Sequence, residues 1–205
     1  MNTQVQALQP LPQGPYPVAM IEQLMLADGR RVIVRPVLPQ DAAGEQALVT
    51  AMSPNSRRMR FHGAVSQLPA SLLRQMTDID YRRHVALVAE ALVDSDTTEL
   101  IADARYVVRS DSPEQGEFAI AVADAWQGLG LGRRLLKRLA EHACRHGVRR
   151  LDGSVLVGNH TMLAMMQMLG AWIRDDPDDA TLMRVSLACP APACGECPVT
   201  PRLDA

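Results

Sequence analysis

The sequence lacks the features that bring a chain to a membrane or to nucleic acid. No stretch approaches the roughly 20 apolar residues that span a bilayer, and the N-terminus has no basic start followed by an apolar core, as a secretory signal would. The formal net charge is −2 over 205 residues, so no general basic surface is available for nucleic acid or anionic lipid. Any recognition of charge is therefore expected to be local.

Cysteine is scarce and unevenly distributed. Three of the four cysteines fall within the last 17 residues, whereas a disulfide scaffold spreads its cysteines through the fold. A reducing, cytoplasmic environment is therefore the expectation. The four are Cys144, Cys189, Cys194 and Cys197.

The spacing of metal ligands is missing as well. Cys194 and Cys197 form one CxxC without a partner pair, so a C-terminal tail is favoured over a zinc site. His142 and His146 lie four residues apart, but no third ligand accompanies them, and an exposed pair is expected. The sequence predicts no metal.

Proline-rich ends bound a single folded region. Residues 1–18 and 189–205 each carry four prolines, which resist regular structure. The remaining length suits one domain with its own core. We therefore predict a Pro-rich N-terminal tail over 1–18, one domain over 19–188, and a Cys- and Pro-rich C-terminal tail over 189–205.

Inside the domain, apolar patterns and turn signals predict strands followed by alternating helices and strands. Asp28-Gly29 predicts a hairpin, and Gly147 predicts a left-handed end to an amphipathic helix that begins near Leu131. The expected fold is α/β or α+β with a mixed sheet. Strands are expected over 21–26, 31–35, 83–93, 99–109, 117–123, 151–157 and 182–188, and further helices over 39–52, 53–62, 71–76 and 159–169.

The most informative segment is a glycine loop between a strand and the amphipathic helix. The loop runs from Gln127 to Gly132, and Arg133 and Arg134 follow it. Backbone N–H groups at a helix start, aided by the helix dipole, bind anions. Glycine is expected there because a Cβ would block phosphate oxygens from approaching the main chain.

Spacing separates this loop from other phosphate-binding loops. No Gly-Lys-Ser/Thr follows, which excludes a Walker loop, and the glycines are spaced G-x-G-x-G rather than in the Rossmann fashion. Gln127, Gly130 and Gly132 instead satisfy Q/R-x-x-G-x-G/A. The remaining alternative is a plain glycine turn before a helix.

This stretch resembles the coenzyme A-binding motif of the GNAT superfamily. The similarity extends over about 31–188 and includes Val32-Ile33-Val34-Arg35-Pro36, Met52–Arg57, Met76–Tyr81 and His84–Ala89. Together these segments look like the catalytic domain of bacterial protein lysine acetyltransferases, the group that modifies acyl-CoA synthetases.

The resemblance implies a central, mixed, mostly antiparallel sheet flanked by helices, in which a splayed strand binds acetyl-CoA. Val122 and Ala123 would pair with the pantetheine arm, and Asn159 would touch it. The pyrophosphate would be held by Gln127, Gly128, Leu129, Gly130, Leu131, Gly132 and Arg133.

Acylation needs a neutral amine, so a base must take its proton. The resemblance implies that Glu117, at the start of the cofactor-binding strand, is this base; the alternative is a solvated strand-end residue. Glu90 and Asp124 are weaker candidates. Where many members carry a general-acid tyrosine this chain has Met166, so the thiolate leaves unassisted, through water, or with help from another residue.

The methionines around Met166 are interpreted as core rather than as an acyl pocket. They are Met162, Met165, Met166 and Met168. Five arginines on segments before the second of the longer strands either form a basic acceptor wall or are solvated: Arg57, Arg58, Arg60, Arg82 and Arg83.

The sequence thus predicts an acetyl-CoA-dependent N-acetyltransferase whose acceptor is a primary amine, most readily a lysine of a partner protein such as an acyl-CoA synthetase. Two alternatives stay open. One is a small-molecule amine acetyltransferase, and the other is a non-catalytic acyl-CoA-binding sensor.

Overall fold

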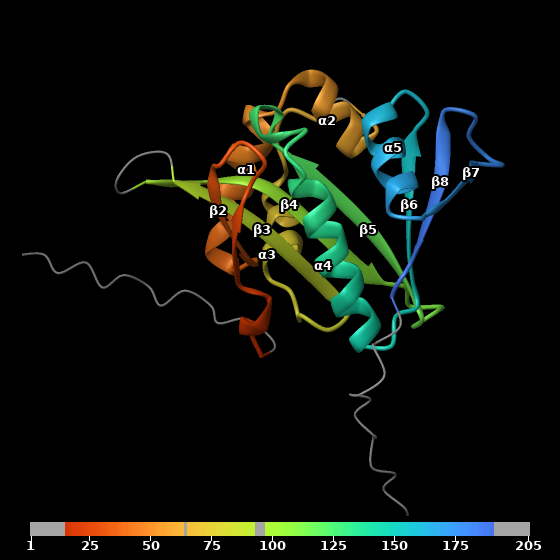
Figure 1. Ribbon diagram of the computed structural model, residues 1–205, viewed down its shortest axis with the longest axis horizontal. Helices are drawn as coiled ribbons and strands as arrows, with labels where there is room; N and C mark the ends of the chain where they lie inside the picture. Colours follow the sequence, from red (N-terminus) through yellow and green to blue (C-terminus); the bar gives the residue numbers. More distant parts are fainter. Residues whose placement is uncertain (1–14, 64, 93–96, 191–205) are drawn as a thin grey trace, which may run out of the picture.

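The computed structural model describes residues 15–63, 65–92 and 97–190, which form one sheet with helices on both faces (Figure 1). Eight strands follow one another in the order β1-β2-β3-β4-β5-β6-β8-β7. Among these strands β5 and β6 are the one parallel pair, so the predicted mixed, mostly antiparallel sheet is confirmed. The strands are β1 (Glu22–Met25), β2 (Arg31–Pro36), β3 (His84–Leu92), β4 (Thr98–Val108), β5 (Gln115–Val122), β6 (Arg150–Leu156), β7 (Trp172–Asp175) and β8 (Leu182–Ala188).

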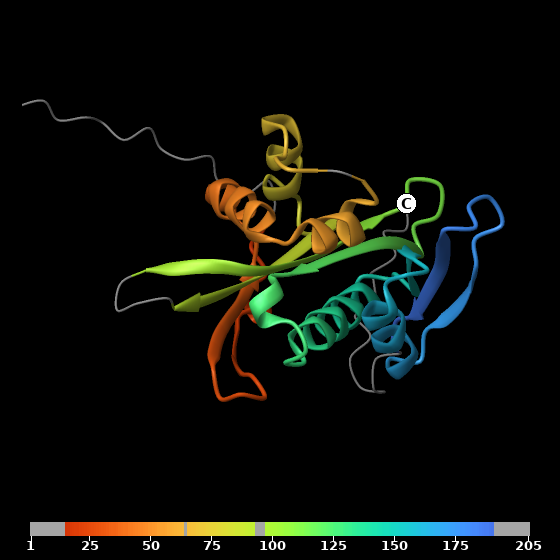
Figure 2. The same cartoon turned by 90° about the horizontal axis from the view of Figure 1, so that it is seen from above.

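The helices divide between the two faces of the sheet. Figure 2 shows α1, α2 and α3 on one side and α4 and α5 on the other. Short 3₁₀ turns precede the sheet, open α1 and lead into the glycine loop. The helices are α1 (Ala42–Ala51), α2 (Pro54–Phe61), α3 (Ala70–Thr77), α4 (Leu131–Arg145) and α5 (His160–Met168); the 3₁₀ turns are η1 (Val18–Met20), η2 (Pro39–Asp41) and η3 (Asp124–Trp126).

Helix α4 forms the core against the sheet. Gly147 follows it at φ 83°. The apolar residues that recur along it at three- and four-residue steps are all buried: Leu131, Leu135, Leu136, Leu139, Ala140 and Ala143. His142 corrects the expectation of an exposed pair: it is 4% exposed, and its Nδ1 lies 3.0 Å from the Tyr106 hydroxyl of β4. The reason is helical spacing, because His142 lies one turn beyond Leu139 on the stripe that faces the sheet.

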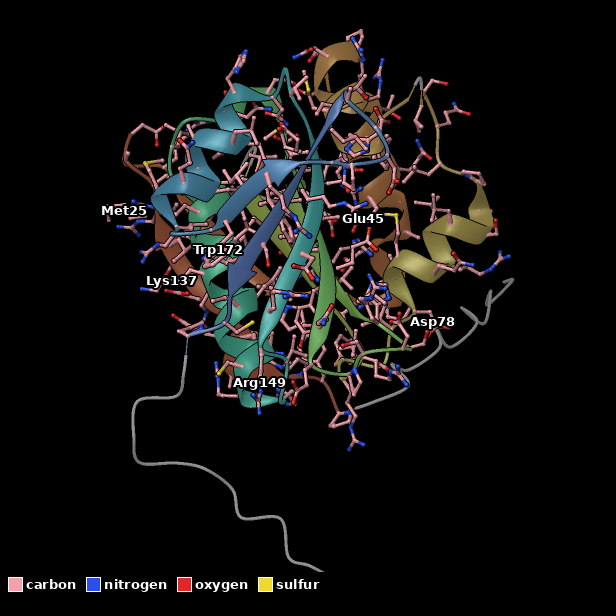
Figure 3. The ribbon with its side chains drawn as sticks, turned by 90° about the vertical axis from the view of Figure 1, so that its right-hand side faces the viewer. Met25, Glu45, Asp78, Lys137, Arg149 and Trp172 are labelled. Atoms are coloured by element: carbon pink, nitrogen blue, oxygen red, sulfur yellow. The ribbon has the colours of Figure 1, made fainter. Side chains whose placement is uncertain are left out.

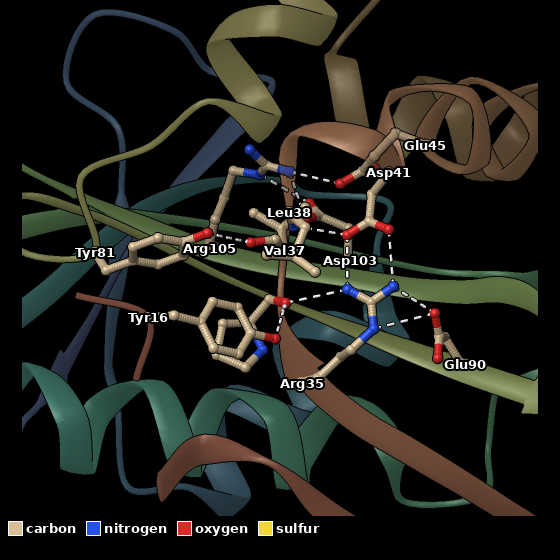
Figure 4. Close-up of polar contacts among 11 residues, drawn as sticks. Tyr16, Arg35, Val37, Leu38, Asp41, Glu45, Tyr81, Glu90, Asp103 and Arg105 are labelled. Carbon is tan, nitrogen blue, oxygen red and sulfur yellow. Dashed lines mark hydrogen bonds and ion pairs between the residues drawn. The ribbon is translucent and has the colours of Figure 1, made fainter. Parts of the chain in front are cut away.

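The opposite face carries a buried group of charges. Arg105 of β4 donates to Glu45 of α1 at 2.9 Å and to Asp103 at 2.5 Å (Figure 4). It also donates to the Met76 carbonyl at the end of α3. Arg60 of α2 approaches Asp103 at 3.9 Å. Figure 3, in which Glu45 is labelled, shows the sheet between this helical layer and α4. The group therefore holds α1, α2 and α3 on one face of the sheet.

The sequence missed β7, the four-residue edge strand. Trp172 at its start is 84% exposed, and β7 pairs with β8 alone among the described strands. Such a short edge strand has neither a long apolar run nor a clear alternation to announce it.

Residues 15–18 and 189–190 of the predicted tails lie within the described ranges, and Tyr16 and Cys189 among them bond to the domain. The Tyr16 hydroxyl donates to the Pro36 carbonyl, and the Cys189 N–H donates to the Arg149 carbonyl. Cys194 and Cys197 lie outside the described residues. No helix in the described part of the chain is long and apolar enough to cross a bilayer.

Candidate active site

The central feature of the site is a gap between β5 and β6. The two strands pair over Gln115–Glu117 and Arg150–Asp152. Beyond Glu117, β5 continues beside β4 to Val122, while β6 continues beside β8 to Leu156. Figure 1 shows the two strands diverging toward the start of α4. This is the splay that the resemblance implied.

The main chain at the end of β5 faces that gap. The Ala123 N–H donates to the Ile101 carbonyl at 2.8 Å, toward β4. Because backbone groups alternate in direction along a strand, those of Val122 point the other way, toward β6. Val122 can therefore contact a molecule in the gap through its N–H, whereas the Ala123 N–H is already bonded to β4 and the Val122 carbonyl already accepts from the Gln127 amide.

The glycine loop closes the wide end of the gap. Gly128 and Gly130 have φ of 75° and 84°, and Gly130 is the N-cap of α4. A Cβ at either glycine would meet nothing within 4 Å, so the space in front of the loop is open. The first-turn N–H groups of α4 have no intrahelical partners and adjoin this space. Arg133 and Arg134 are exposed beside it. The loop thus fits a pyrophosphate.

Gly132 lies against α5 and β5 rather than in front of open space. A Cβ there would lie 3.4 Å from Met165 Sδ, 3.5 Å from Ile120 Cδ1 and 3.8 Å from Val122 Cγ2, which are ordinary van der Waals distances. The part of Gly132 in holding the pyrophosphate stays a prediction.

Gln127 and Asp124 connect the loop with α2. The Gln127 amide donates to the Val122 carbonyl at 2.9 Å and to Ser56 Oγ at 3.3 Å. Asp124 accepts hydrogen bonds from Ser53 and Ser56. Burial raises the pKa of Asp124, but these hydrogen bonds outweigh it and the pKa is lowered. A carboxylate held in its charged form by donors is poorly suited to act as a base.

Glu117 lies at the last paired position before the gap. Its neighbour Phe118 is buried and pairs with Tyr106, which contacts α4, so Glu117 points to the opposite face. Its side chain is exposed there. Its partner across β6 is Asp152, which the Ser186 hydroxyl holds at 2.6 Å. Glu117 is therefore accessible to an incoming amine.

Glu90 is occupied elsewhere. It forms an ion pair with Arg35, whose guanidinium also donates to Asp41 at 2.7 and 2.8 Å (Figure 4). Glu90 thus belongs to a link between β2, β3 and η2, away from the gap.

Residues of α5 border the gap from the other side. The Asn159 side chain accepts from the Met162 N–H through Oδ1, capping α5. A contact with a cofactor arm would then come from its Nδ2. Met166 is fully buried, so its interpretation as core is confirmed, whereas Met168 is 70% exposed and is not core.

The five arginines do not form one wall. Arg60 is partly buried beside Asp103, and Arg57 donates to the carbonyls of Thr50 and Met52 at the end of α1. Arg58 is exposed, and Arg57 and Arg58 line an open pocket of 480 Å³ beside α2. Arg82 and Arg83 are exposed at the start of β3.

Comparison with known proteins identifies the family. A model of the Acetyltransferase (GNAT) family matches residues 53–171, more than half of the chain. The chain belongs to this family. As a GNAT acetyltransferase it is an acyltransferase enzyme, and acetyl-CoA is the co-substrate of its family.

Relatives and solved structures agree. An acetyltransferase of Pseudomonas aeruginosa (PA5475) is 35% identical over 156 residues, which span 76% of this chain and 83% of that protein. Acetyltransferase Pat of Mycolicibacterium smegmatis is 32% identical over 149 residues, 72% of this chain but 44% of that protein. The GNAT domain of S. lividans PAT superposes with a TM-score of 0.77 at 26% identity, covering 85% of this chain and 99% of that domain.

The described residues contain no cluster of metal ligands, because no three His, Cys, Asp or Glu side chains lie together in a way that could hold an ion. His142 instead bonds to Tyr106 and stacks on His146 at 4.1 Å. The sequence had no signal for this use of the histidine pair, since their spacing suits either arrangement.

Proposed function

We propose that this GNAT enzyme transfers the acetyl group of acetyl-CoA to the side-chain amine of a lysine on a partner protein, with Glu117 as the base. The observation that carries the proposal is the position of Glu117: an exposed carboxylate at the point where β5 and β6 separate. A carboxylate at this position adjoins the end of the gap and is also open to solvent.

The gap supports binding of the pantetheine arm. Val122 offers its main chain, and Asn159 offers Nδ2 from the facing helix. The loop from Gln127 to Arg133 offers backbone N–H groups for the pyrophosphate. The Gln127 side chain supports this role indirectly, by fixing the Val122 carbonyl.

The chain's own groups supply two parts of the chemistry. Glu117 accepts the proton of the ammonium, whose ordinary pKa near 10.4 keeps it charged at neutral pH. The main-chain N–H of Val122 faces the gap and can polarise a carbonyl there, as an oxyanion donor does. Met166 cannot donate a proton and is fully buried, so the departing thiolate takes its proton from water.

A protein acceptor is favoured by two findings. The relatives with similar domains include proteins named Pat and PAT. In this chain the Glu117 side chain is exposed, so a side chain presented by another protein can reach it. An acyl-CoA synthetase is the partner that the resemblance suggests.

Thiol release tests whether the chain turns over. The protein is incubated with acetyl-CoA and a panel of lysine peptides, polyamines and amino acids, and free thiol is measured. We expect release that depends on a lysine peptide and is strongly reduced in Glu117→Gln. Tight acetyl-CoA binding without thiol release with any amine would instead identify a non-catalytic sensor.

A further inference from the structure

Asp124 joins the cofactor loop to α2 by three hydrogen bonds across the fold. Its Oδ2 accepts from the Ser53 N–H at 2.9 Å. Its Oδ1 accepts from the Ser53 hydroxyl at 2.8 Å and the Ser56 hydroxyl at 2.7 Å. Asp124 begins η3, immediately before the loop, and the two serines form the first turn of α2.

The start of α2 depends on these contacts. Ser53 is the N-cap of this eight-residue helix, and its Oγ accepts from the Ser56 N–H at 3.2 Å. The same Oγ donates to Asp124, so the cap is oriented by the carboxylate. Isolated helices of this length are not stable in water, and α2 therefore owes its position to such tertiary contacts.

The segment that carries Asp124 is also held from its other side. The Arg30 guanidinium, in the β1–β2 turn, lies 3.8 Å from the ring centroid of Trp126 and donates to the Ala125 carbonyl at 3.0 Å. Gln127 bridges Ser56 Oγ and the Val122 carbonyl. The end of β5, η3 and the first turn of α2 thus form one connected unit.

We propose that Asp124 is a positioning residue that couples the cofactor loop to α2, so that acetyl-CoA on the loop orders the helix that borders the acceptor face. This rests on the proposed cofactor site. Hydrogen bonds that involve an ionised carboxylate are stronger than neutral ones, and the lowered pKa of Asp124 keeps it charged at neutral pH. Because coupling between sites is reciprocal, an acceptor on α2 also strengthens acetyl-CoA binding.

Hydrogen–deuterium exchange with coenzyme A as the probe tests the coupling in the full chain. In the wild type, saturating coenzyme A is expected to slow exchange over residues 127–134 and over 54–61, the latter at least about fivefold, the lower end of usual coupling. In Asp124→Ala the loop stays protected and the protection of 54–61 is lost. Asp124→Asn, which keeps one acceptor oxygen, is expected to lie between.

Asp111→Ala is the matched control. Asp111 is an exposed aspartate in the β4–β5 turn, at the far end of β5, where it pairs with Arg109. The same chemical change there should leave both protected segments as in the wild type. Ser56→Ala removes the hydroxyl between Asp124 and Gln127 and provides a second test if Asp124→Ala does not fold. This variant should reduce the protection of residues 54–61.

The outcomes separate this inference from the proposed function. Protection of neither segment in the wild type would remove the loop from the cofactor site. Protection of the loop without α2 in the wild type would overturn the coupling alone. The coupling would also be overturned if α2 were protected in the folded Asp124→Ala or Ser56→Ala variant as strongly as in the wild type.

Discussion

Among single residues, the glycines with positive φ give the sharpest test of the cofactor loop. Gly130 begins α4 at φ 84° and Gly147 follows its end at φ 83°; neither position would crowd a Cβ. Alanine is expected to cost about 1 kcal/mol of backbone strain at each. Gly130→Ala should also weaken acetyl-CoA binding about tenfold, because its methyl group lies where phosphate approaches.

Isothermal titration with acetyl-CoA and thermal unfolding of both variants check this. Gly147→Ala serves as the control, since it has the same strain at the opposite end of the same helix. Equal acetyl-CoA affinity in the two variants would show that the loop does not bind the pyrophosphate.

Glu117 is the residue on which the chemistry depends. Glu117→Gln should bind acetyl-CoA normally and turn over about 10²–10⁴ times more slowly at neutral pH, the usual effect of losing a general base. Activity should recover partly at high pH, where more of the amine is neutral. Steady-state kinetics across pH measure both effects.

Glu99→Gln provides the comparison for Glu117, because Glu99 is an exposed glutamate on β4 near the opposite end of the sheet. It should behave as the wild type. If Glu117→Gln kept wild-type turnover at neutral pH, the proton would be taken by another group, and Asp152 on the adjacent strand would be examined next.

Several residue roles could not be read from the sequence. The sequence places Gln127 in the motif, but the structure shows that its amide binds the Val122 carbonyl and the Ser56 hydroxyl. Asp124 had no motif to mark it as a helix anchor. The contacts of Gln127 and Asp124 with the first turn of α2 join segments about 70 positions apart, which local patterns do not encode.

At the level of elements, α2 is the segment expected to meet a partner protein. Arg58 is exposed on it beside the open pocket, whereas Arg57 also binds the end of α1. Arg58→Glu is therefore expected to raise the KM for an acidic protein acceptor severalfold and to spare acetyl-CoA affinity, since rim charges act mainly on encounter. Kinetics with the partner protein at two salt concentrations measure this.

Arg82→Glu is the matched change, at an exposed arginine before β3. It should leave the KM for the partner unchanged. Equal effects of the two reversals would show that general charge, and not α2, attracts the acceptor.

Elements with a clear apolar pattern or clear turn signals were predictable, and one short edge strand was not. The strands β3, β4 and β5 and the helices α2, α3 and α5 were placed within about two residues, the usual uncertainty at element ends. The edge strand β7 was missed because its four residues mix an exposed tryptophan with charged side chains. Its place in the sheet is set by pairing with β8.

For the whole molecule, the buried charges between the helices and the sheet predict a pH-dependent stability. Burial raises the pKa of Glu45 well above its ordinary value of 4.5, and the charge of Asp103 adds to this. The folded state therefore keeps the proton that the unfolded state releases, so this contribution to stability is lost as pH rises above 4.5. Glu45→Gln imitates the protonated form.

Urea unfolding of the wild type and Glu45→Gln from about pH 5 to about pH 9 measures this linkage. The unfolding midpoint of the variant should rise relative to the wild type as pH increases. Groups other than Glu45 contribute to both proteins and cancel in the difference. A difference that is flat with pH would mean that Glu45 is ionised in the folded protein.

The mostly antiparallel sheet with its splayed strand was implied by the resemblance to the GNAT superfamily, whereas an α/β or α+β domain with a mixed sheet followed from the order of strands and helices. The buried charge group did not, since Glu45, Asp103 and Arg105 look like surface residues until α1 packs on β4. Charged residues are seldom buried unless they are paired, and pairing across the fold has no local signature.

The measurement that tests the central claim most directly is transfer of labelled acetyl from acetyl-CoA into a bacterial lysate containing acyl-CoA synthetases, followed by mass spectrometry. The account predicts label on lysine side chains of one or a few proteins, with the signal lost in Glu117→Gln and retained in Glu99→Gln. Label found solely on polyamines or free amino acids, with no acetylated protein lysine, would contradict it.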